Sequence, residues 1–113
     1  MNSKIAKTRR RKNAQSREAL APDWDLLLYV AGPTPRSVAA FRNLEQICEE
    51  HLAGRYHIEV IDLMKDPRIA RDRQIVAVPT VVRKWPPPAR KIIGDLSNTA
   101  RAMAGLELPP QRQ

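Results

Sequence analysis

The spacing of apolar side chains in the first half of the chain predicts a strand, a helix and a second strand. Residues 23–31 form a short, nearly continuous apolar run, as is typical of a buried strand. Within residues 34–54 the apolar positions recur with the helical period instead. Thr34 can cap this helix, the proline after it suits the first turn, and Gly54 fits the end. In residues 56–60 apolar and polar residues alternate, which predicts a half-buried strand. The apolar face of the predicted helix contains Val38, Phe41, Leu44, Ile47, Cys48 and Leu52.

Shorter elements are predicted in the second half of the chain. Asp66, followed by a proline, repeats the helix start signal, and residues 69–76 can form a short helix and its exit. Residues 78–82 have the composition of a strand, in which Pro79 favours an edge position, a strand start or a cis peptide bond. Three consecutive prolines at residues 86–88 end this strand, because they lack N–H donors.

The last two predicted elements complete a known order. Residues 90–94 predict one more short strand, and Asp95 or Ser97 can cap a final helix that reaches Leu106. The order of elements is therefore β-α-β-α-β-β-α. The first two strands are expected to be parallel, because a right-handed crossover joins them. This order is that of the thioredoxin-like α/β fold.

Charge is distributed unevenly over the 113 residues, whose formal net charge is +8. Residues 1–22 hold seven basic residues and one acidic residue, whereas residues 23–113 hold 13 basic and 11 acidic residues. The first segment has almost no apolar periodicity, so it cannot bury enough surface to offset the entropy of ordering. We therefore expect a basic, disordered leader at residues 1–22, one folded domain at residues 23–108 and a frayed C-terminus at residues 109–113.

The leader raises the question of nucleic-acid binding. Four consecutive cations at residues 9–12 could contact phosphates, since clustered cations release counterions from a polyanion. No aromatic residue is interleaved in the leader, which removes base stacking as a support. The sequence alone therefore favours a solvated leader over a nucleic-acid ligand.

Side chains for catalysis or metal binding are scarce. A thioredoxin-type oxidoreductase needs a Cys-x-x-Cys pair at the start of its first helix, but residues 32–35 read Gly-Pro-Thr-Pro. The single cysteine, Cys48, lies on the predicted apolar face, where we expect it to be buried. His51 and His57 have no nucleophile or metal-ligand set near them. We expect no enzymatic activity, no cofactor and no metal.

The hydropathy pattern does not indicate a membrane protein. The longest apolar run, at residues 26–31, is far below the ~20 residues that a membrane span needs. No secretory signal pattern is evident at the basic N-terminus. The expectation is a soluble, cytoplasmic protein that does not bind membranes.

Several short blocks occur in order with matching spacing. Residues 28–38 read Leu-Tyr-Val-Ala-Gly-x-Thr-Pro-x-Ser-Val, and residues 60–67 contain Val-Ile-Asp-Leu and Lys-Asp-Pro. Residues 77–80 read Ala-Val-Pro-Thr, residues 86–97 read Pro-Pro-Pro-Ala-Arg-Lys-Ile-Ile-Gly-Asp-Leu-Ser, and Gly-Leu-Glu follows at 105–107. Together these blocks resemble the KaiB family of bacterial circadian clock proteins. The resemblance covers roughly residues 24–108 and leaves the leader outside.

The resemblance implies a fold-switching adaptor without enzymatic activity. KaiB-like proteins have a resting fold of order β-α-β-β-α-α-β, usually as a homotetramer, and a rarer monomeric state with the thioredoxin-like order. The rarer state binds the ATPase ring of the hexameric protein KaiC, captures KaiA and displaces the sensor kinase SasA. Two packings that differ by a few kcal/mol can exchange, and a partner that binds one of them shifts the population.

The resemblance also implies which residues bias the two folds and which contact the partner. The first group is Trp24, Pro79, Gly105 and Glu107, in which Trp24 replaces the usual Tyr and Glu107 the usual Asp. From the residue alone, the first interpretation of Gly105 is an ordinary helix C-cap. The second group is Tyr56, Thr80, Arg83, Arg90 and Lys91, whose basic members around a proline-rich backbone suit an acidic protein surface.

Three interpretations of function remain. The first is an adaptor for a KaiC-type ATPase. The second is a KaiB-like paralogue in stress or two-component signalling through a histidine kinase. The third is a nucleic-acid-associated protein that uses the cations of residues 4–17.

Overall fold

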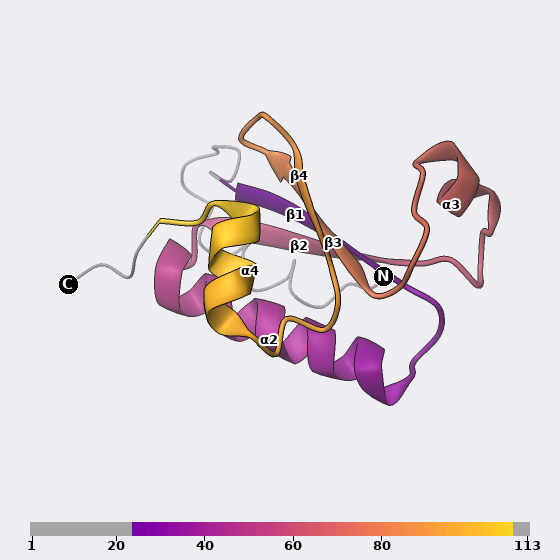
Figure 1. Cartoon of the computed structure of the whole chain (residues 1–113), viewed down its shortest axis with the longest axis horizontal. Coiled ribbons are helices and arrows are strands. Elements are labelled where there is room, and N and C mark those ends of the chain that lie inside the picture. The colour runs from indigo at the N-terminus through magenta and orange to yellow at the C-terminus, as the bar shows by residue number, and fades with distance from the viewer. Residues whose placement is uncertain (1–23, 110–113) are drawn as a thin grey trace.

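In the computed structural model, residues 24–109 are described, and they form one mixed four-stranded sheet with three helices (Figure 1). Residues 1–23 and 110–113 lie outside this range. The predictions of a disordered leader and a frayed C-terminus therefore concern residues that are not described, apart from Pro109. The observed order is the predicted β-α-β-α-β-β-α, so the thioredoxin-like prediction is confirmed. The elements are β1 (Trp24–Val30), α2 (Pro35–Leu52), β2 (Tyr56–Asp62), α3 (Arg68–Asp72), β3 (Thr80–Trp85), β4 (Arg90–Ile93) and α4 (Thr99–Leu106).

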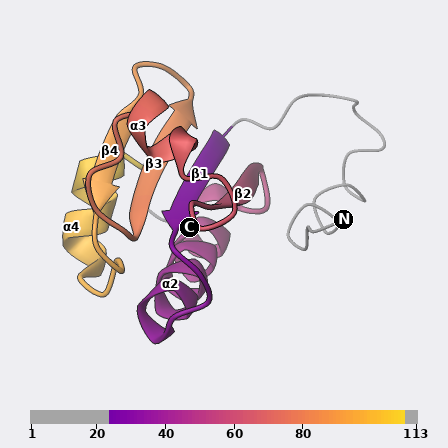
Figure 2. The same ribbon diagram turned by 90° about the vertical axis from the view of Figure 1, so that its right-hand side faces the viewer.

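The strand order in the sheet is β2-β1-β3-β4. Strands β1 and β2 are parallel, as the crossover through α2 requires, and the other neighbours are antiparallel. Alternate residues of β1 face opposite sides. Leu26 and Leu28 belong to the core shared with α2 and α4, whereas Leu27 and Tyr29 belong to a smaller cluster with α3. Figure 2 shows α3 on the side of the sheet away from α2.

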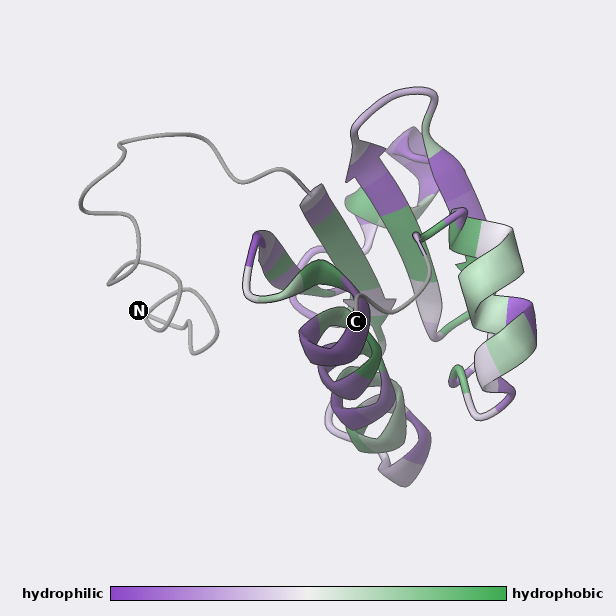
Figure 3. Cartoon of the chain, turned by 90° about the vertical axis from the view of Figure 1, so that its left-hand side faces the viewer, coloured by the Kyte–Doolittle hydropathy of each residue, from purple (hydrophilic) through white to green (hydrophobic). Residues whose placement is uncertain are grey.

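Helix α2 forms where its capping and apolar signals agree. Thr34 is the N-cap, and its side chain accepts a hydrogen bond from the Ser37 N–H at 3.1 Å. Ala53 ends the helix in the left-handed conformation, and Gly54 follows with a positive φ. The helix is hydrophobic toward the sheet and hydrophilic outside (Figure 3). Val38 is an exception to the predicted apolar face, because it is 43% exposed.

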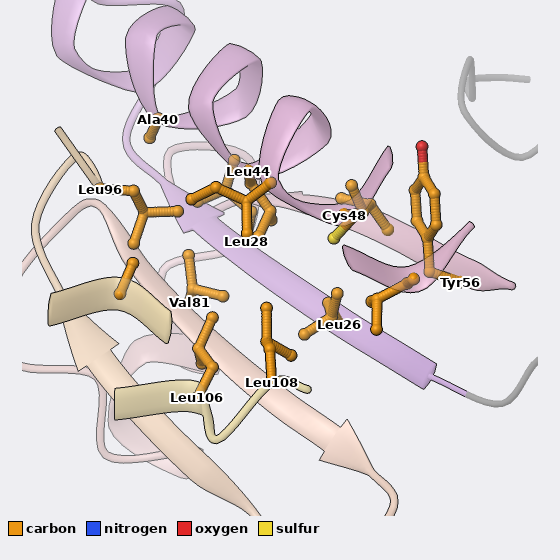
Figure 4. Close-up of a cluster of buried hydrophobic side chains, with 14 of the residues drawn as sticks. Leu26, Leu28, Ala40, Leu44, Cys48, Tyr56, Val81, Leu96, Leu106 and Leu108 are labelled. Carbon is orange, nitrogen blue, oxygen red and sulfur yellow. The ribbon is translucent and has the colours of Figure 1, made fainter. Parts of the chain in front are cut away.

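The main core lies between α2, α4 and one face of the sheet. Figure 4 shows Ala40, Leu44 and Cys48 of α2 directed toward β1, with Leu106 on the opposite side of the cluster. Each of these four side chains is fully buried. The core is therefore continuous across the sheet face and joins both halves of the chain.

Three predictions about helix ends are wrong. Helix α3 begins at Arg68 without a side-chain cap, so Asp66 does not cap it. Helix α4 is capped by Asn98, whose Oδ1 accepts from the Arg101 N–H at 3.0 Å, rather than by Asp95 or Ser97. Asp95 instead accepts a hydrogen bond from the Ser97 N–H at 3.0 Å.

The third wrong prediction concerns Gly105, which lies inside α4 rather than at its C-cap. The left-handed C-cap residue is Glu107, with φ 54°. Gly105 is instead a point of close approach between helix and sheet. A Cβ at this position would lie 2.9 Å from Ile92 Cδ1 on β4. For Pro79, two of the three predicted alternatives hold, since the Val78–Pro79 bond is cis and β3 starts directly after it.

Candidate functional site

The position where thioredoxins carry their dithiol is occupied by a turn without cysteine. The N–H groups of Gly32 and Met64 donate to Asp62 Oδ1 at 3.0 and 2.9 Å, and Ser37 Oγ donates to the Gly32 carbonyl at 2.9 Å. Asp62 thus ties the start of α2 to the end of β2. The geometry is that of a structural turn, and it places no nucleophile at the helix N-terminus.

The only cysteine lies deep in the core. Cys48 is fully buried, and this burial, with a smaller contribution from the charge of Glu49, raises the pKa of its thiol. A thiol with a raised pKa carries little thiolate at neutral pH, and the thiolate is the reactive form. The prediction that Cys48 is buried is confirmed.

The most unusual polar residue of the fold is a buried arginine on β3. Arg83 is 4% exposed, although it sits near the end of a short strand. Its Nη1 donates to the carbonyl of Leu106 at 2.9 Å and, more weakly, to that of Glu107 at 3.4 Å, and its Nη2 donates to the carbonyl of Pro88 at 2.7 Å. A buried cation is costly unless its donors are satisfied. These carbonyls satisfy most of them, and Nε has no hydrogen-bond partner within residues 24–109.

Arg83 is well suited to this place because helix ends leave carbonyls without partners. The last turn of α4 exposes carbonyl oxygens with partial negative charge, which a cation stabilises. Strand pairing sets Arg83 opposite Leu26, on the sheet face that α4 covers. The carbonyl of Pro88 comes from the proline-rich turn between β3 and β4. One side chain therefore fixes the turn and the end of the last helix together.

Three more side chains surround this guanidinium. The ring centroid of Trp24 lies 5.6 Å from Arg83 Cζ, a cation–π distance. Glu107 Oε1 lies 3.9 Å from Arg83 Nη2, and Glu107 Oε2 lies 3.1 Å from Arg90 Nη2. We call Trp24, Arg83, Pro88, Arg90, Leu106 and Glu107 the Arg83 cluster.

The cluster unites residues from both groups that the resemblance implied. Trp24 and Glu107 come from the fold-biasing group, and Arg83 and Arg90 come from the partner group. The sequence did not indicate that these side chains lie in one cluster, because two of the atoms that Arg83 contacts are the backbone carbonyls of Pro88 and Leu106. The other two residues of the first group lie outside the cluster. Gly105 faces Ile92, and the Pro79 carbonyl accepts from the Gly94 N–H at 2.9 Å.

The five residues expected at a partner surface do not form one surface in this fold. Tyr56, Thr80 and Arg83 are buried in this state, and a role of any of the five residues at a partner surface stays a prediction. Tyr56 donates to Glu49, and Thr80 Oγ1 donates to the Ala77 carbonyl at 2.7 Å. Arg90 and Lys91 are exposed on β4, and Lys91 Nζ donates to the Gln74 carbonyl at 3.2 Å.

A surface groove lies between α2 and the edge strand β2, with a volume of about 700 Å³. Val38 and Val60, the two exposed apolar residues of these elements, both line it, together with Phe41. Arg42 and Lys65 add charge to its lining. The sequence pattern gave no sign of this groove, because it treated both valines as core positions.

Within residues 24–109, three or more His, Cys, Asp or Glu side chains nowhere gather as a metal would require. No helix in the same part of the chain is both long and apolar enough to cross a membrane.

Fold and site together define a thioredoxin-like domain that lacks the thioredoxin dithiol. Comparison with known proteins refines this class. The model of the KaiB domain matches residues 27–108, and a KaiB circadian clock oscillator protein from Acaryochloris marina is 51% identical over 83 residues, covering 74% of this chain and 80% of the relative. Its counterpart from Microcystis aeruginosa is 49% identical over the same length and coverage. The chain belongs to the KaiB family.

Solved structures agree on the fold. The N-terminal domain of SasA from Synechococcus elongatus aligns with a TM-score of 0.62 at 20% identity, over 80% of this chain and 87% of that domain. Mitochondrial thioredoxin 3 from Saccharomyces cerevisiae aligns with a TM-score of 0.59 at 20% identity, over 76% of this chain and 78% of that one. At this identity the likeness establishes the thioredoxin-like fold alone.

Proposed function

We propose that this protein is a non-enzymatic adaptor of a clock or signalling system, which binds a KaiC-type ATPase ring and regulates its phosphorylation rhythm. The observation that carries the proposal is membership of the KaiB family over nearly the whole described domain, since the relatives are named as circadian clock oscillator proteins. The turn without cysteine at the start of α2 supports a binding role over thiol chemistry. The proposed location is the cytoplasm.

A shared fold supports the proposed competition with a sensor kinase. The SasA N-terminal domain and this chain have the same thioredoxin-like architecture. Two domains of one shape can occupy one site on a ring, so binding of this protein would displace a SasA-type kinase. Capture of a KaiA-type protein is the second proposed consequence of ring binding.

We also propose that the chain has a second, resting fold, as a homo-oligomer of order β-α-β-β-α-α-β. The Arg83 cluster supports this proposal because it holds the C-terminal half with few polar contacts. Changes at Trp24 or Glu107 would alter the surroundings of the buried guanidinium and so the balance between the two folds. A partner that binds only the thioredoxin-like state then draws the population toward it.

For the ring contact we propose the exposed cations of β4. Arg90 and Lys91 follow the proline-rich turn, whose restricted backbone lowers the ordering cost of binding. Their charge suits an acidic protein surface. Buried Arg83 and Thr80 act on this contact only through the pairing of β3 with β4, whereas Tyr56 lies on β2 at the opposite edge of the sheet.

The test is size-exclusion chromatography with light scattering. The protein is run alone, and then after many hours with a hexameric KaiC-type ATPase and nucleotide. The expected result is a resting oligomer that converts slowly into a high-mass complex. Lys91→Glu is expected to weaken the complex roughly tenfold, whereas the exposed control Arg101→Glu on α4 leaves it unchanged. No complex under any nucleotide condition would overturn the proposal.

The second candidate function is signalling through a histidine kinase outside a clock. The shared fold with the SasA N-terminal domain is the observation in its favour. Chromatography with a sensor kinase in place of the ring distinguishes the two. Binding to the kinase without binding to the ring would replace the first proposal with the second.

A further inference from the structure

The groove between α2 and β2 combines a buried apolar floor with exposed apolar walls. Leu28 and Val30 of β1 are buried and belong to its lining. Val38 on α2 and Val60 on β2 also line it, and both are exposed. The volume of about 700 Å³ lies within the range of small-molecule sites, which is about 300–1,000 Å³. An apolar ligand in this groove would remove both exposed valines from water, which is favourable.

The unpaired charge of the groove is positive. Arg42 and Lys65 line it and are exposed, and neither side chain has a hydrogen bond or an ion pair with another residue of the range 24–109. Two carboxylates also belong to the lining. Asp62 Oδ1 accepts hydrogen bonds from two backbone N–H groups, and Glu45 is engaged as well. The two cations are therefore the charges that a ligand would neutralise.

These charges are ordered along the groove. Val38, Arg42 and Glu45 are spaced by four and three residues, so they follow one another on one face of α2 over about 10 Å. Lys65 lies at the end where α2 begins, because its N–H donates to the Asp62 carbonyl and Asp62 is hydrogen-bonded to the turn before the helix. The N-terminus of α2 adds positive potential at this end. The groove is thus positive toward the start of α2 and has its remaining carboxylate, Glu45, at the other end.

We propose that this groove binds a small medium-chain carboxylate, with its alkyl chain against the valines and its carboxylate beside Lys65 and Arg42. A neutral alkyl ligand would leave both cations unpaired, and a hydrophilic anion would gain nothing from the apolar lining. The lining residues all fall within residues 28–65. This part of the chain has the β-α-β order that both proposed folds share, so the site does not depend on the adaptor function.

The test is a nuclear magnetic resonance titration of the ¹⁵N-labelled full-length protein with decanoate. The expected dissociation constant is about 0.1–1 mM, as for a ligand of this size. Amide shifts should be confined to the groove, at the start of α2, the end of β2 and the turn that contains Lys65. Octanoate, which is two methylene groups shorter, should bind roughly 4–15-fold more weakly.

Variants of the groove test each half of the recognition. Arg42→Gln with Lys65→Gln should weaken decanoate binding about fivefold, because the carboxylate loses both cations. Val38→Asp should weaken it at least about fivefold, because it places a charge in the apolar part. Arg101→Gln and Val76→Asp change an exposed cation and an exposed apolar residue outside the lining, and both should bind decanoate like the unmodified protein.

Four outcomes would overturn the proposal. The first is the absence of amide shifts at decanoate concentrations well above about 1 mM. The second is unchanged affinity in the groove variants. The third is equal affinity for decyltrimethylammonium, which has the same chain and the opposite charge, since the cations would then not be recognised. The fourth is saturable binding of a glutamate-rich peptide without binding of decanoate, which would assign the groove to a protein segment instead.

Discussion

The two halves of the domain are held together in different ways. Residues 24–62 form two parallel strands joined by the long helix α2, which buries six of its residues against the sheet. Residues 68–106 contain the short helix α3, which buries none, and α4, which buries only Ala102 and Leu106. The first half therefore depends on apolar packing. The helices of the second half bury fewer side chains, and one buried arginine adds polar contacts between its segments.

The second half of the domain is therefore the part that can be rearranged at low cost. Apolar packing is spread over many side chains, so no single loss releases α2. Arg83 gathers the proline-rich turn and the end of α4 on one guanidinium, so these two segments are released together. Regions with little buried apolar surface open locally at lower free energy than the whole domain.

The largest effect is expected from matched leucine truncations in the two halves. Leu44 on α2 and Leu106 on α4 are both fully buried. Leu44→Ala is expected to lower the free energy of unfolding by about 3–4 kcal/mol, because the long helix cannot move to fill the cavity. Leu106→Ala is expected to cost about 2 kcal/mol, since the short helix can shift. Urea unfolding measures both, and equal losses would contradict the contrast between the halves.

The second prediction concerns the hydrogen bonds by which Arg83 connects the proline-rich turn to the end of α4. Arg83→Met keeps most of the side-chain volume but leaves the carbonyls of Pro88 and Leu106 without their donor, at an expected cost of about 2–3 kcal/mol. Hydrogen exchange should show the loss mainly in α4 and β4. Amides of β1 and α2 should lose protection only as far as global stability falls.

Arg90→Met is the matched control for the loss of charge. Arg90 shares Glu107 with Arg83 but is partly exposed, so its ion pair is expected to contribute less than about 1 kcal/mol. A uniform loss of protection over the whole domain in Arg83→Met would show that the arginine supports the entire core. The two halves would then not differ as described.

The third prediction uses Cys48 to test whether water is excluded from the core of the first half. Burial raises the pKa of its thiol in the folded state, whereas the unfolded value is about 8.5. The folded protein keeps this proton when the unfolded chain loses it, so the stabilisation is complete below about pH 8.5 and declines above it. The expected decline is about 1.4 kcal/mol for each pH unit above that value.

Comparison with Cys48→Ala isolates this proton from other groups that titrate in the same range. The difference in unfolding free energy between the two proteins should shrink between about pH 8.5 and pH 10. A thiol reagent should also react with the native protein only as fast as the core opens. A difference that stays constant with pH would mean that water reaches the sulfur.

The first half of the domain was also easier to predict from the sequence than the second half. Helix α2 was predictable because Thr34, the proline after it and the apolar spacing all agree. The cap of α4 was not, because Asp95, Ser97 and Asn98 are all capping residue types and only the packing of the helix selects Asn98.

The candidate site was less predictable still. Arg83 is a charged residue in a strand, which from sequence indicates a solvated position. Its burial depends on backbone carbonyls of the turn and of α4, and backbone atoms have no sequence signature. The family resemblance pointed to Trp24 and Glu107 without indicating that the same guanidinium connects them.

The smallest predicted effect concerns the contact between α4 and β4. Gly105 lies within α4, where alanine is favoured over glycine by about 1 kcal/mol. A Cβ there would press on Ile92 Cδ1 at 2.9 Å, the far end of a flexible side chain. Gly105→Ala alone is therefore expected to change stability by less than about 1 kcal/mol, since the gain in propensity and the crowding oppose each other.

A double-mutant cycle with Ile92→Val separates these two opposing effects. Valine lacks the Cδ1 atom, so Ile92→Val alone is expected to cost about 1 kcal/mol, whereas Gly105→Ala in that background becomes stabilising by about the same amount. The coupling between the two changes should be favourable and at least about 0.5 kcal/mol. Urea unfolding of the four proteins measures it. If the two changes are simply additive, α4 is free to move away from β4. The contact between α4 and β4 would then contribute little, and Arg83 would be the main contact that holds α4 in place.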